Sequence, residues 1–313
     1  MTRSVYCKYK QCFVSICVYP PLKAKPLPRR RRDDVDDSRV HEYPQHLRAA
    51  IEDAPTGAGV YTFHGQEGDL PLYIGKSINI RARLLSHLRT PDEARMLRQT
   101  RRISHIRTAG EIGALLLEAQ MIKAQHPLFN QKLRRNKQLC SLQMAGDVPQ
   151  VVYSKDIDFA SELDLYGLFA SRHAALDALR AIADQNKLCY GPLGLEKLPL
   201  GKACFRAAIH QCAGVCRGDE SQAEHRERLF SSLLALRVAC WPYPGAVGLV
   251  ERDEAFTQIH VVKHWCYLGS APTLDEARQL SQMTSQVAAG FDADGYKILC
   301  KPLLTQSVDV QVL

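Results

Sequence analysis

The chain has 313 residues, of which 46% are hydrophobic and 24% are charged, and its formal net charge at pH 7 is +8. This length has room for two or three modules that each bury a core, and the composition excludes a wholly disordered or fibrous protein. The apolar stretch at residues 12–19 is too short for a membrane span of about 20 residues, and no small-residue cleavage site follows it, so we expect a cytoplasmic protein without a transmembrane helix.

Charge is unevenly distributed along the sequence. Residues 1–32 contain nine Lys and Arg and no acid, residues 33–69 contain two bases and nine acids, and residues 70–140 contain 14 bases and four acids. A strongly positive segment within a folded region is the electrostatic footprint of a polyanion site, most often nucleic acid. Residues 1–42 show no sustained periodicity and mix prolines with charge blocks, so we expect a disordered tail there.

The first predicted module spans residues 43–135. Its first elements are two short strands at 59–63 and 70–75, joined by a polar, glycine-containing stretch, which together predict a hairpin. Apolar residues at helical spacing follow the hairpin and predict a helix, with Ser77 or Asn79 as its N-cap.

The second half of this module is predicted to contain two helices and a strand. A basic helix starts at Pro91 and ends near Arg102, and a strand at 104–108 precedes a strong helix at 111–125, which Pro127 ends. The order β-β-α-α-β-α predicts a small α/β domain.

Two further segments are expected after the first module. Residues 136–218 form a middle segment, with predicted strands at 150–154 and 165–170, a helix at 172–184 and a cysteine-rich stretch at 189–216. Residues 219–313 form a C-terminal α/β module, with predicted helices at 223–238 and 274–287 and strands at 246–250 and 257–262.

One carboxylate lies within the apolar stripe of the helix at 111–125. Glu118 is three residues after Leu115 and four before Ile122, and both belong to this stripe. An unpaired buried carboxylate costs several kcal/mol or takes up a proton, so Glu118 requires an arginine, a backbone donor or a metal ion. Helical spacing alone slightly favours a salt bridge to a neighbouring helix over a metal ion.

The same module carries two tyrosines and a series of bases. Tyr61 and Tyr73 lie in the predicted strands, where tyrosine is common because it packs well. A basic side chain near a helix N-terminus, where backbone N–H groups also favour an anion, is typical of a phosphate contact. We expect six bases to contact the backbone of DNA or RNA, which are Lys76, Arg81, Arg89, Arg98, Arg101 and Arg102.

Five short motifs occur in order within this module. They are Gly59-Val60-Tyr61, Tyr73-Ile74-Gly75-Lys76-Ser77, Asn79-Ile80 followed by Arg83, Leu115-Leu116-Leu117-Glu118-Ala119 and Pro127-Leu128-Phe129-Asn130. Together they resemble the GIY-YIG nuclease domain, in the version found at the N-terminus of the UvrC excinuclease. The resemblance covers about residues 45–135, with Val60 in place of Ile, and His87 stands where UvrC more often carries an aromatic residue.

The resemblance implies an α+β fold with a short, mainly antiparallel sheet flanked by helices. It also implies roles in phosphodiester hydrolysis, which requires an activated water and neutralisation of the charge that grows on the phosphoryl oxygens. Glu118 would be the sole protein ligand of Mg²⁺ or Mn²⁺, with water and phosphate in the other positions. Arg83 would hold the scissile phosphate.

The general base implied by the resemblance is Tyr61. An ordinary phenol, with a pKa of about 10, is a poor base near neutral pH, so its pKa is expected to be depressed by Lys76 and the metal. Tyr73 would orient water or phosphate, and Asn130 would hold the active-site backbone together. His64 is the rival candidate for the base.

Four of the eleven cysteines lie within 28 residues. Cys189, Cys204, Cys212 and Cys216 could hold an iron–sulfur cluster or zinc, or they could cluster by coincidence. Their spacing does not match the paired C-x-x-C of a zinc ribbon. The tract that contains the last three is similar to the cysteine segment after the nuclease domain of UvrC, which implies a 4Fe–4S cluster, and we favour that cofactor over zinc.

Full-length UvrC also carries a second nuclease domain and a helix-hairpin-helix pair, for which the ~95 residues after Cys216 are too few. The chain therefore resembles the short homologues of UvrC. This implies an endonuclease of nucleotide excision repair that incises the damaged strand on the 3′ side of a bulky lesion, in DNA processed by UvrA and UvrB. The alternatives are a non-catalytic DNA-binding adaptor, which would not need Glu118, Arg83 or Tyr61, and a nuclease that acts on branched DNA.

Overall fold

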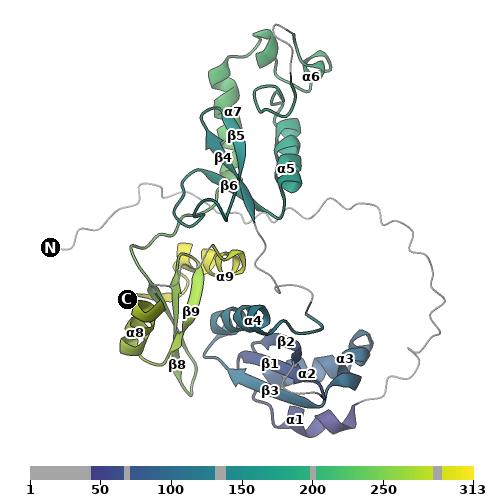
Figure 1. Ribbon diagram of the computed structural model, residues 1–313, viewed down its shortest axis with the longest axis vertical. Helices are drawn as coiled ribbons and strands as arrows, with labels where there is room; N and C mark the ends of the chain where they lie inside the picture. Colours follow the sequence, from purple (N-terminus) through teal and green to yellow (C-terminus); the bar gives the residue numbers. More distant parts are fainter. Residues whose placement is uncertain (1–43, 67–70, 131–138, 198–201, 285–290) are drawn as a thin grey trace, which may run out of the picture. The chain divides into compact units, whose positions relative to one another are not determined.

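The computed structural model describes residues 44–66, 71–130, 139–197, 202–284 and 291–313. These residues form two compact units. The first unit runs from residue 139 to Cys240, and the second combines the described residues before 131 with those from Trp241 onward (Figure 1).

Two of the predictions for the N-terminal region fall outside this description. The expected disordered tail and the apolar stretch at 12–19 both lie before residue 44. In the part of the chain that is described, no helix has the length and apolar character that crossing a membrane requires.

The nuclease-like part of the second unit is built on a three-stranded antiparallel sheet in the order β2-β1-β3, which confirms the predicted hairpin. A Cβ at Gly59 would lie 2.2 Å from the carbonyl oxygen of Ile106, so only glycine allows β1 and β3 to pair there. The strands are β1 (Gly59–His64), β2 (Pro71–Ser77) and β3 (Arg102–Arg107).

Helices cover both faces of this sheet. Tyr61 and Phe63 share a core with α1, α2 and α3, whereas Val60, on the opposite face of β1, packs with Ile122 of α4. Asn79 is the N-cap of α2, since its side chain accepts from the backbone N–H of Ala82 at 2.9 Å. The helical segments are η2 (Gln45–Leu47), α1 (Arg48–Glu52), α2 (Ile80–Leu88), η3 (Pro91–Glu93), α3 (Ala94–Gln99) and α4 (Glu111–Gln125).

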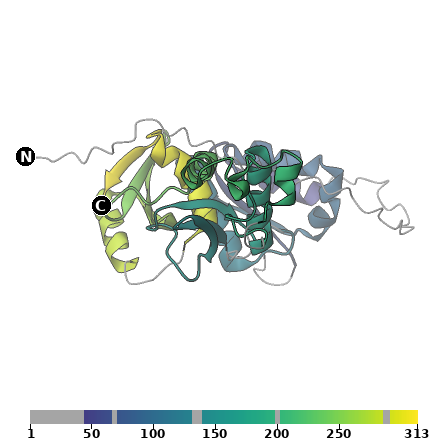
Figure 2. The ribbon, with the colours of Figure 1, turned by 90° about the horizontal axis from the view of Figure 1, so that it is seen from above.

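The C-terminal part of the second unit is a four-stranded antiparallel sheet in the order β10-β7-β8-β9, with α8 packed on β8 and β9. Figure 2 shows these elements, coloured yellow-green to yellow, from a second direction. They are β7 (Val247–Arg252), β8 (Thr257–Lys263), β9 (Cys266–Ala271), α8 (Leu274–Thr284), α9 (Ala293–Leu304) and β10 (Asp309–Val312).

The C-terminal part contacts both ends of α4, the helix that carries Glu118. The N-cap of α4, Gly110, supplies no side-chain acceptor, and the Glu251 carboxylate of β7 instead accepts from the backbone N–H groups of Ile112 at 3.0 Å and Gly113 at 2.8 Å. His260 of β8 holds the same carboxylate at 2.9 Å. A capping residue of one module thus lies in the other module.

The opposite end of α4 is fixed by an ion pair. Lys123 lies 2.6 Å from Asp292, the N-cap of α9, and 3.2 Å from Asp294. The helix is apolar on two sides. One side packs on the β2-β1-β3 sheet, and the other, which includes Leu116 and Ala119, faces α9.

Replacing Glu251 with glutamine is expected to lower the free energy of unfolding by about 1 kcal/mol, because a charged cap at a helix N-terminus is lost. Burial opposes ionisation of Glu251, but the bonds from His260, Gly113 and Ile112 outweigh it and lower its pKa. The contribution is therefore present above the unfolded pKa of about 4.3 and is lost as the pH falls through the lower folded pKa. Denaturant unfolding at several pH values measures it.

The exposed Glu254 provides the matched control, since Glu254→Gln removes the same charge from the same part of the module. Equal unfolding curves for the two variants would contradict the capping role of Glu251.

The first unit contains an antiparallel sheet in the order β5-β4-β6. The boundary expected at residue 218 needs correction, because α7 packs in this unit through Leu229 and Leu233, which join the core formed with α5. The elements are β4 (Cys140–Ala145), β5 (Val148–Tyr153), β6 (Leu165–Phe169), α5 (Arg172–Gln185), α6 (Phe205–Ala208), η4 (Val215–Arg217), α7 (Gln222–Leu233) and η5 (Leu234–Leu236).

Candidate active site

A cleft lies beside β2, the edge strand of the nuclease sheet. It has a volume of about 410 Å³. Its walls include five of the residues for which the family resemblance implies a part in catalysis. The complete lining is Tyr61, Tyr73, Lys76, Ser77, Ile78, Arg83, Glu111 and Glu118. The strand edge, the start of α2 and the middle of α4 thus bring together residues that are far apart in the sequence.

Tyr61 reaches this cleft because the residue opposite it is a glycine. Tyr61 of β1 pairs with Gly75 of β2, so their side-chain positions share one face of the sheet. A Cβ at Gly75 would lie 2.4 Å from the Tyr61 hydroxyl oxygen and 2.8 Å from the Tyr73 ring. The glycine therefore lets the phenol pass over the edge strand.

The Tyr61 hydroxyl lies 2.6 Å from His87 Nε2, and His87 Nδ1 is in turn bonded to the Glu93 carboxylate. Burial raises the pKa of Tyr61 well above its usual value, and a hydrogen bond from Arg83 opposes this only in part. The expectation of a depressed pKa is therefore wrong for the protein without a bound metal. The cation beside the phenol is Arg83, whereas Lys76 is paired with Glu111 at 2.7 Å.

His64 lies on the opposite face of β1 from Tyr61. Its Nε2 is 2.7 Å from the Ser104 hydroxyl of β3, and its side chain is absent from the lining of the cleft. This position favours Tyr61 over the rival base His64.

Glu118 is a partly buried carboxylate next to two basic side chains. It is half-buried in the cleft wall, where burial raises its pKa, and Lys76 and Arg83 lower it without cancelling this effect. These two bases lie on β2 and α2. A hard cation such as Mg²⁺ takes one or two carboxylate ligands and keeps several waters, and the cleft has the donor and the space for it.

Asn130 forms two hydrogen bonds with the backbone of one residue of β2. Its side chain accepts from Ile74 N–H at 2.9 Å and donates to the Ile74 carbonyl at 2.8 Å. It lies outside the cleft lining, so it holds the edge strand in place and does not face the cleft.

The predicted DNA-contacting bases differ in their surroundings. Arg81 donates to the carbonyl of Ala54 at 2.7 Å and so supports the loop before β1. Lys76 lines the cleft. The other four are exposed on or beside α2, α3 and β3, and they are Arg89, Arg98, Arg101 and Arg102.

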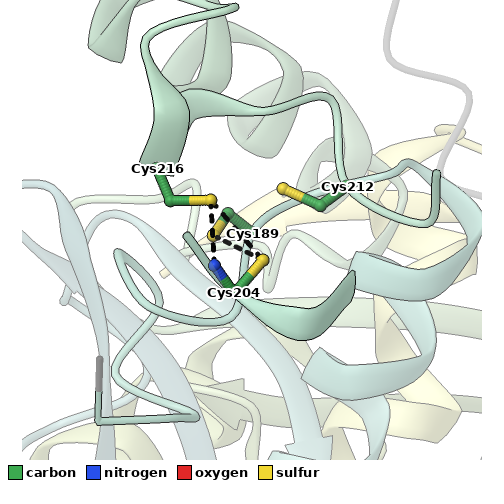
Figure 3. Close-up of side chains that lie close together, drawn as sticks. All are labelled: Cys189, Cys204, Cys212 and Cys216. Carbon is green, nitrogen blue, oxygen red and sulfur yellow. Dashed lines mark hydrogen bonds between the residues drawn. The ribbon is translucent and has the colours of Figure 1, made fainter. Parts of the chain in front are cut away.

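The four cysteines converge in the first unit, which argues against coincidental spacing (Figure 3). All four sulfurs lie within 4.8 Å of one another. Cys204 Sγ is 3.8 Å from Cys189 Sγ and 3.5 Å from Cys216 Sγ. Backbone N–H groups also point at two sulfurs, from Cys204 to Cys216 and from Gly214 to Cys212. This donor set fits a thiolate-bound metal centre.

Three family models match the chain in succession. Residues 57–131 match the UvrC-like GIY-YIG domain, residues 130–234 match the UvrC/Cho excinuclease middle domain, and residues 246–313 match the excinuclease Cho C-terminal domain. Excinuclease Cho of Escherichia coli K12 is 57% identical over 282 residues, which cover 90% of this chain and 94% of that protein. The chain belongs to the Cho excinuclease family. It is accordingly a nuclease of the GIY-YIG type, an enzyme that hydrolyses phosphodiester bonds.

More distant similarity extends to UvrC proteins. UvrABC system protein C of Synechococcus sp. is 32% identical over 199 residues, which cover 60% of this chain and 30% of that protein. Among solved structures, the magnesium-bound N-terminal GIY-YIG endonuclease domain of UvrC from Thermotoga maritima is 31% identical, with a TM-score of 0.25, and the match covers 28% of this chain and 97% of that domain.

His87 and Glu93 connect to the cleft through Tyr61, although neither was predicted to have a function. A weak signal was present, because His87 follows Arg83 by one helical turn and thus shares its face of α2.

Proposed function

We propose that this Cho-family chain is a metal-dependent DNA endonuclease of nucleotide excision repair. It would incise the damaged strand on the 3′ side of a bulky lesion, in DNA processed by UvrA and UvrB. The convergence of Glu118, Arg83 and Tyr61 on one cleft carries the proposal of cleavage. The polarity and the two partner proteins rest on the resemblance to the N-terminal nuclease of UvrC.

Each residue of the cleft has a chemical task in this reaction. Glu118 would hold Mg²⁺ or Mn²⁺, which neutralises phosphoryl charge and makes bound water more acidic. Arg83 is exposed and presents a planar guanidinium that suits two phosphoryl oxygens. Tyr61 would hold the proton of the attacking water, and Tyr73 would orient that water or the phosphate.

Strand-specific cleavage of a 5′-labelled duplex with one bulky adduct tests this function. The reaction contains Mg²⁺, with and without UvrA and UvrB, and uses Glu118→Ala as the control. A single nick 3′ to the adduct, absent in the variant, is the expected result. Tight binding without any nick would favour a DNA-binding adaptor, and preferred cutting of flap or bubble DNA would favour a nuclease for branched DNA.

We propose that Cys189, Cys204, Cys212 and Cys216 hold a 4Fe–4S cluster, in keeping with the similar segment of UvrC. Zinc is the second candidate, and one observation favours it. Four sulfurs around a tetrahedral zinc lie about 3.8 Å apart when Zn–S is about 2.3 Å, and two of the sulfur pairs here are 3.8 and 3.5 Å apart. A four-iron cluster would require the sulfurs to move apart.

Purification without air distinguishes these two cofactors. A brown protein whose visible absorbance is lost in Cys212→Ser is the result expected for iron–sulfur. A colourless protein with one zinc per chain would overturn it. Cys240→Ser is the control, because Cys240 lies in the same unit but outside the four-cysteine group.

A further inference from the structure

A chain of hydrogen bonds leads from Tyr61, which lines the cleft, to His87 and Glu93, which do not line it. The Tyr61 hydroxyl contacts His87 Nε2 at 2.6 Å, and His87 Nδ1 contacts the Glu93 carboxylate. The His87 side chain is only 1% exposed and packs edge-on against the rings of Tyr61, Phe63 and Tyr73. The chain thus connects β1 through α2 to η3, where Glu93 is 31% exposed.

The chemistry of this chain assigns a direction to each hydrogen bond. A carboxylate only accepts, so His87 Nδ1 carries the hydrogen that it donates to Glu93. Burial lowers the pKa of His87, and the bond to Glu93 opposes this only in part, so the ring is neutral near pH 7. Nε2 then has a free lone pair, and Tyr61 donates its phenol hydrogen to it.

The hydrogen bond from Tyr61 to His87 explains how Tyr61 could act as a base. Burial raises the pKa of Tyr61, so a free tyrosinate is scarce at neutral pH. A phenol that can pass its own proton to a neighbour does not need to ionise beforehand. The arrangement of hydroxyl, imidazole and carboxylate has the logic of a hydrolase triad, in which the carboxylate orients the ring and stabilises its charged form.

We propose that His87 and Glu93 act through Tyr61 as positioning residues, with His87 taking the phenol proton as Tyr61 takes a proton from the attacking water. The inference rests on the proposed function. The water oxygen bonds to phosphorus, and the bond from phosphorus to the leaving 3′ oxygen breaks. One water proton goes to Tyr61, the phenol proton goes to His87 Nε2, and the leaving oxygen takes a proton from solvent. Glu93 faces the resulting imidazolium.

The groups around His87 fit this role. Glu93 favours the charged ring, whereas Arg83, one turn earlier on the same helix, disfavours it. Tyr61 and Tyr73 face it from β1 and β2. Arg83 lines the cleft, whereas Glu93 contacts the imidazole ring that would receive positive charge.

Single-turnover cleavage at saturating DNA tests the inference in the full-length protein with Mg²⁺. His87→Gln can still accept a hydrogen bond from Tyr61 but cannot take a proton, so we expect a loss of about 100-fold, with unchanged DNA affinity. His105→Gln, an exposed histidine of β3, is the matched control and is expected to cut at the wild-type rate.

Two readouts separate a proton acceptor from a packing residue. At acidic pH, where the wild-type rate falls, the slope of log rate against pH should be smaller by one in His87→Gln, because a neutral His87 is no longer required. In addition, Tyr61→Phe with His87→Gln should cut no more slowly than Tyr61→Phe alone. Additive losses, or an unchanged slope, would overturn the inference.

Glu93→Gln keeps the test decisive if His87→Gln does not fold, since Glu93 is partly exposed. We expect the cleavage rate of this variant to fall about tenfold with an unchanged melting temperature. Full activity would count against proton transfer from Tyr61 to His87. The proposed function fails separately, when the wild type makes no nick 3′ to the adduct. If the wild type makes the nick and the His87 and Glu93 variants nick equally fast, only the proton transfer from Tyr61 to His87 is contradicted.

Discussion

Glu118→Gln is expected to reduce incision by about 10³-fold or more while leaving DNA affinity unchanged. The amide has the size of the carboxylate but lacks the charge that holds a hard cation. The loss should therefore appear in single-turnover cleavage at every Mg²⁺ concentration that supports the wild type, and Mg²⁺ binding measured by calorimetry should weaken in parallel.

Glu111→Gln provides the matched control. Glu111 lies on the same helix and lines the same cleft, but it is 55% exposed and paired with Lys76. We expect less than a tenfold loss in this variant. Equal losses in both variants would mean that the total negative charge of the cleft matters, and that Glu118 has no special role.

Glu118→Gln should also stabilise the metal-free protein. The pKa of Glu118 is raised by burial, so its ionised form costs stability above both the unfolded and the folded pKa. Glutamine removes this cost, and the melting temperature without divalent cations should rise by a few degrees at about pH 8. The difference should vanish below the unfolded pKa of about 4.3, where the cost is absent. A lower melting temperature at pH 8 would show that Glu118 is structural.

Arg83→Ala is expected to slow cleavage by about 10²- to 10³-fold with little change in DNA affinity, because one exposed arginine contributes modestly to binding but meets charge that grows during the reaction. Arg83→Lys should recover only part of this loss, since an ammonium group cannot contact two phosphoryl oxygens in the same plane. Single-turnover rates and filter binding measure the two effects.

Arg98→Ala separates catalysis from binding. Arg98 is exposed on α3 and does not line the cleft, so this variant should weaken binding slightly and cut at the wild-type rate once DNA is saturating. If Arg83→Ala behaves in the same way, Arg83 only contacts the DNA backbone, and the role implied by the family resemblance is wrong.

The sequence was most informative where the determinants are local. The hairpin, the N-cap Asn79 and the end of α4 depend on neighbouring residues, and each was predicted within a few positions. The cleft residues were found because the nuclease motifs keep their types and order. Burial and contact partners were harder to predict. The expected depression of the Tyr61 pKa does not hold in the metal-free protein, because the surroundings of Tyr61 come from three separate elements.

Contacts between distant segments could not be predicted. The boundary at residue 218 was misplaced because α7 has an ordinary amphipathic pattern that does not tell which sheet it covers. The cap from Glu251 and the ion pair of Lys123 with Asp292 join residues 138 to 169 positions apart, and nothing in either segment identifies its partner. The role of His87 depends on Tyr61, 26 positions earlier in the chain, and could not be inferred from the sequence near His87 alone.

The ion pair at the end of α4 also has a consequence for protein synthesis. Lys123 leaves the ribosome 169 residues before Asp292, which is a delay of roughly 8 to 34 s at the usual rates of elongation. Until then, the helix that carries Glu118 lacks its contacts with α9 and, for most of this time, its cap from β7. A chain that stops before Glu251 therefore already carries all five nuclease motifs, but the helix that bears Glu118 still lacks its cap and its outer contacts.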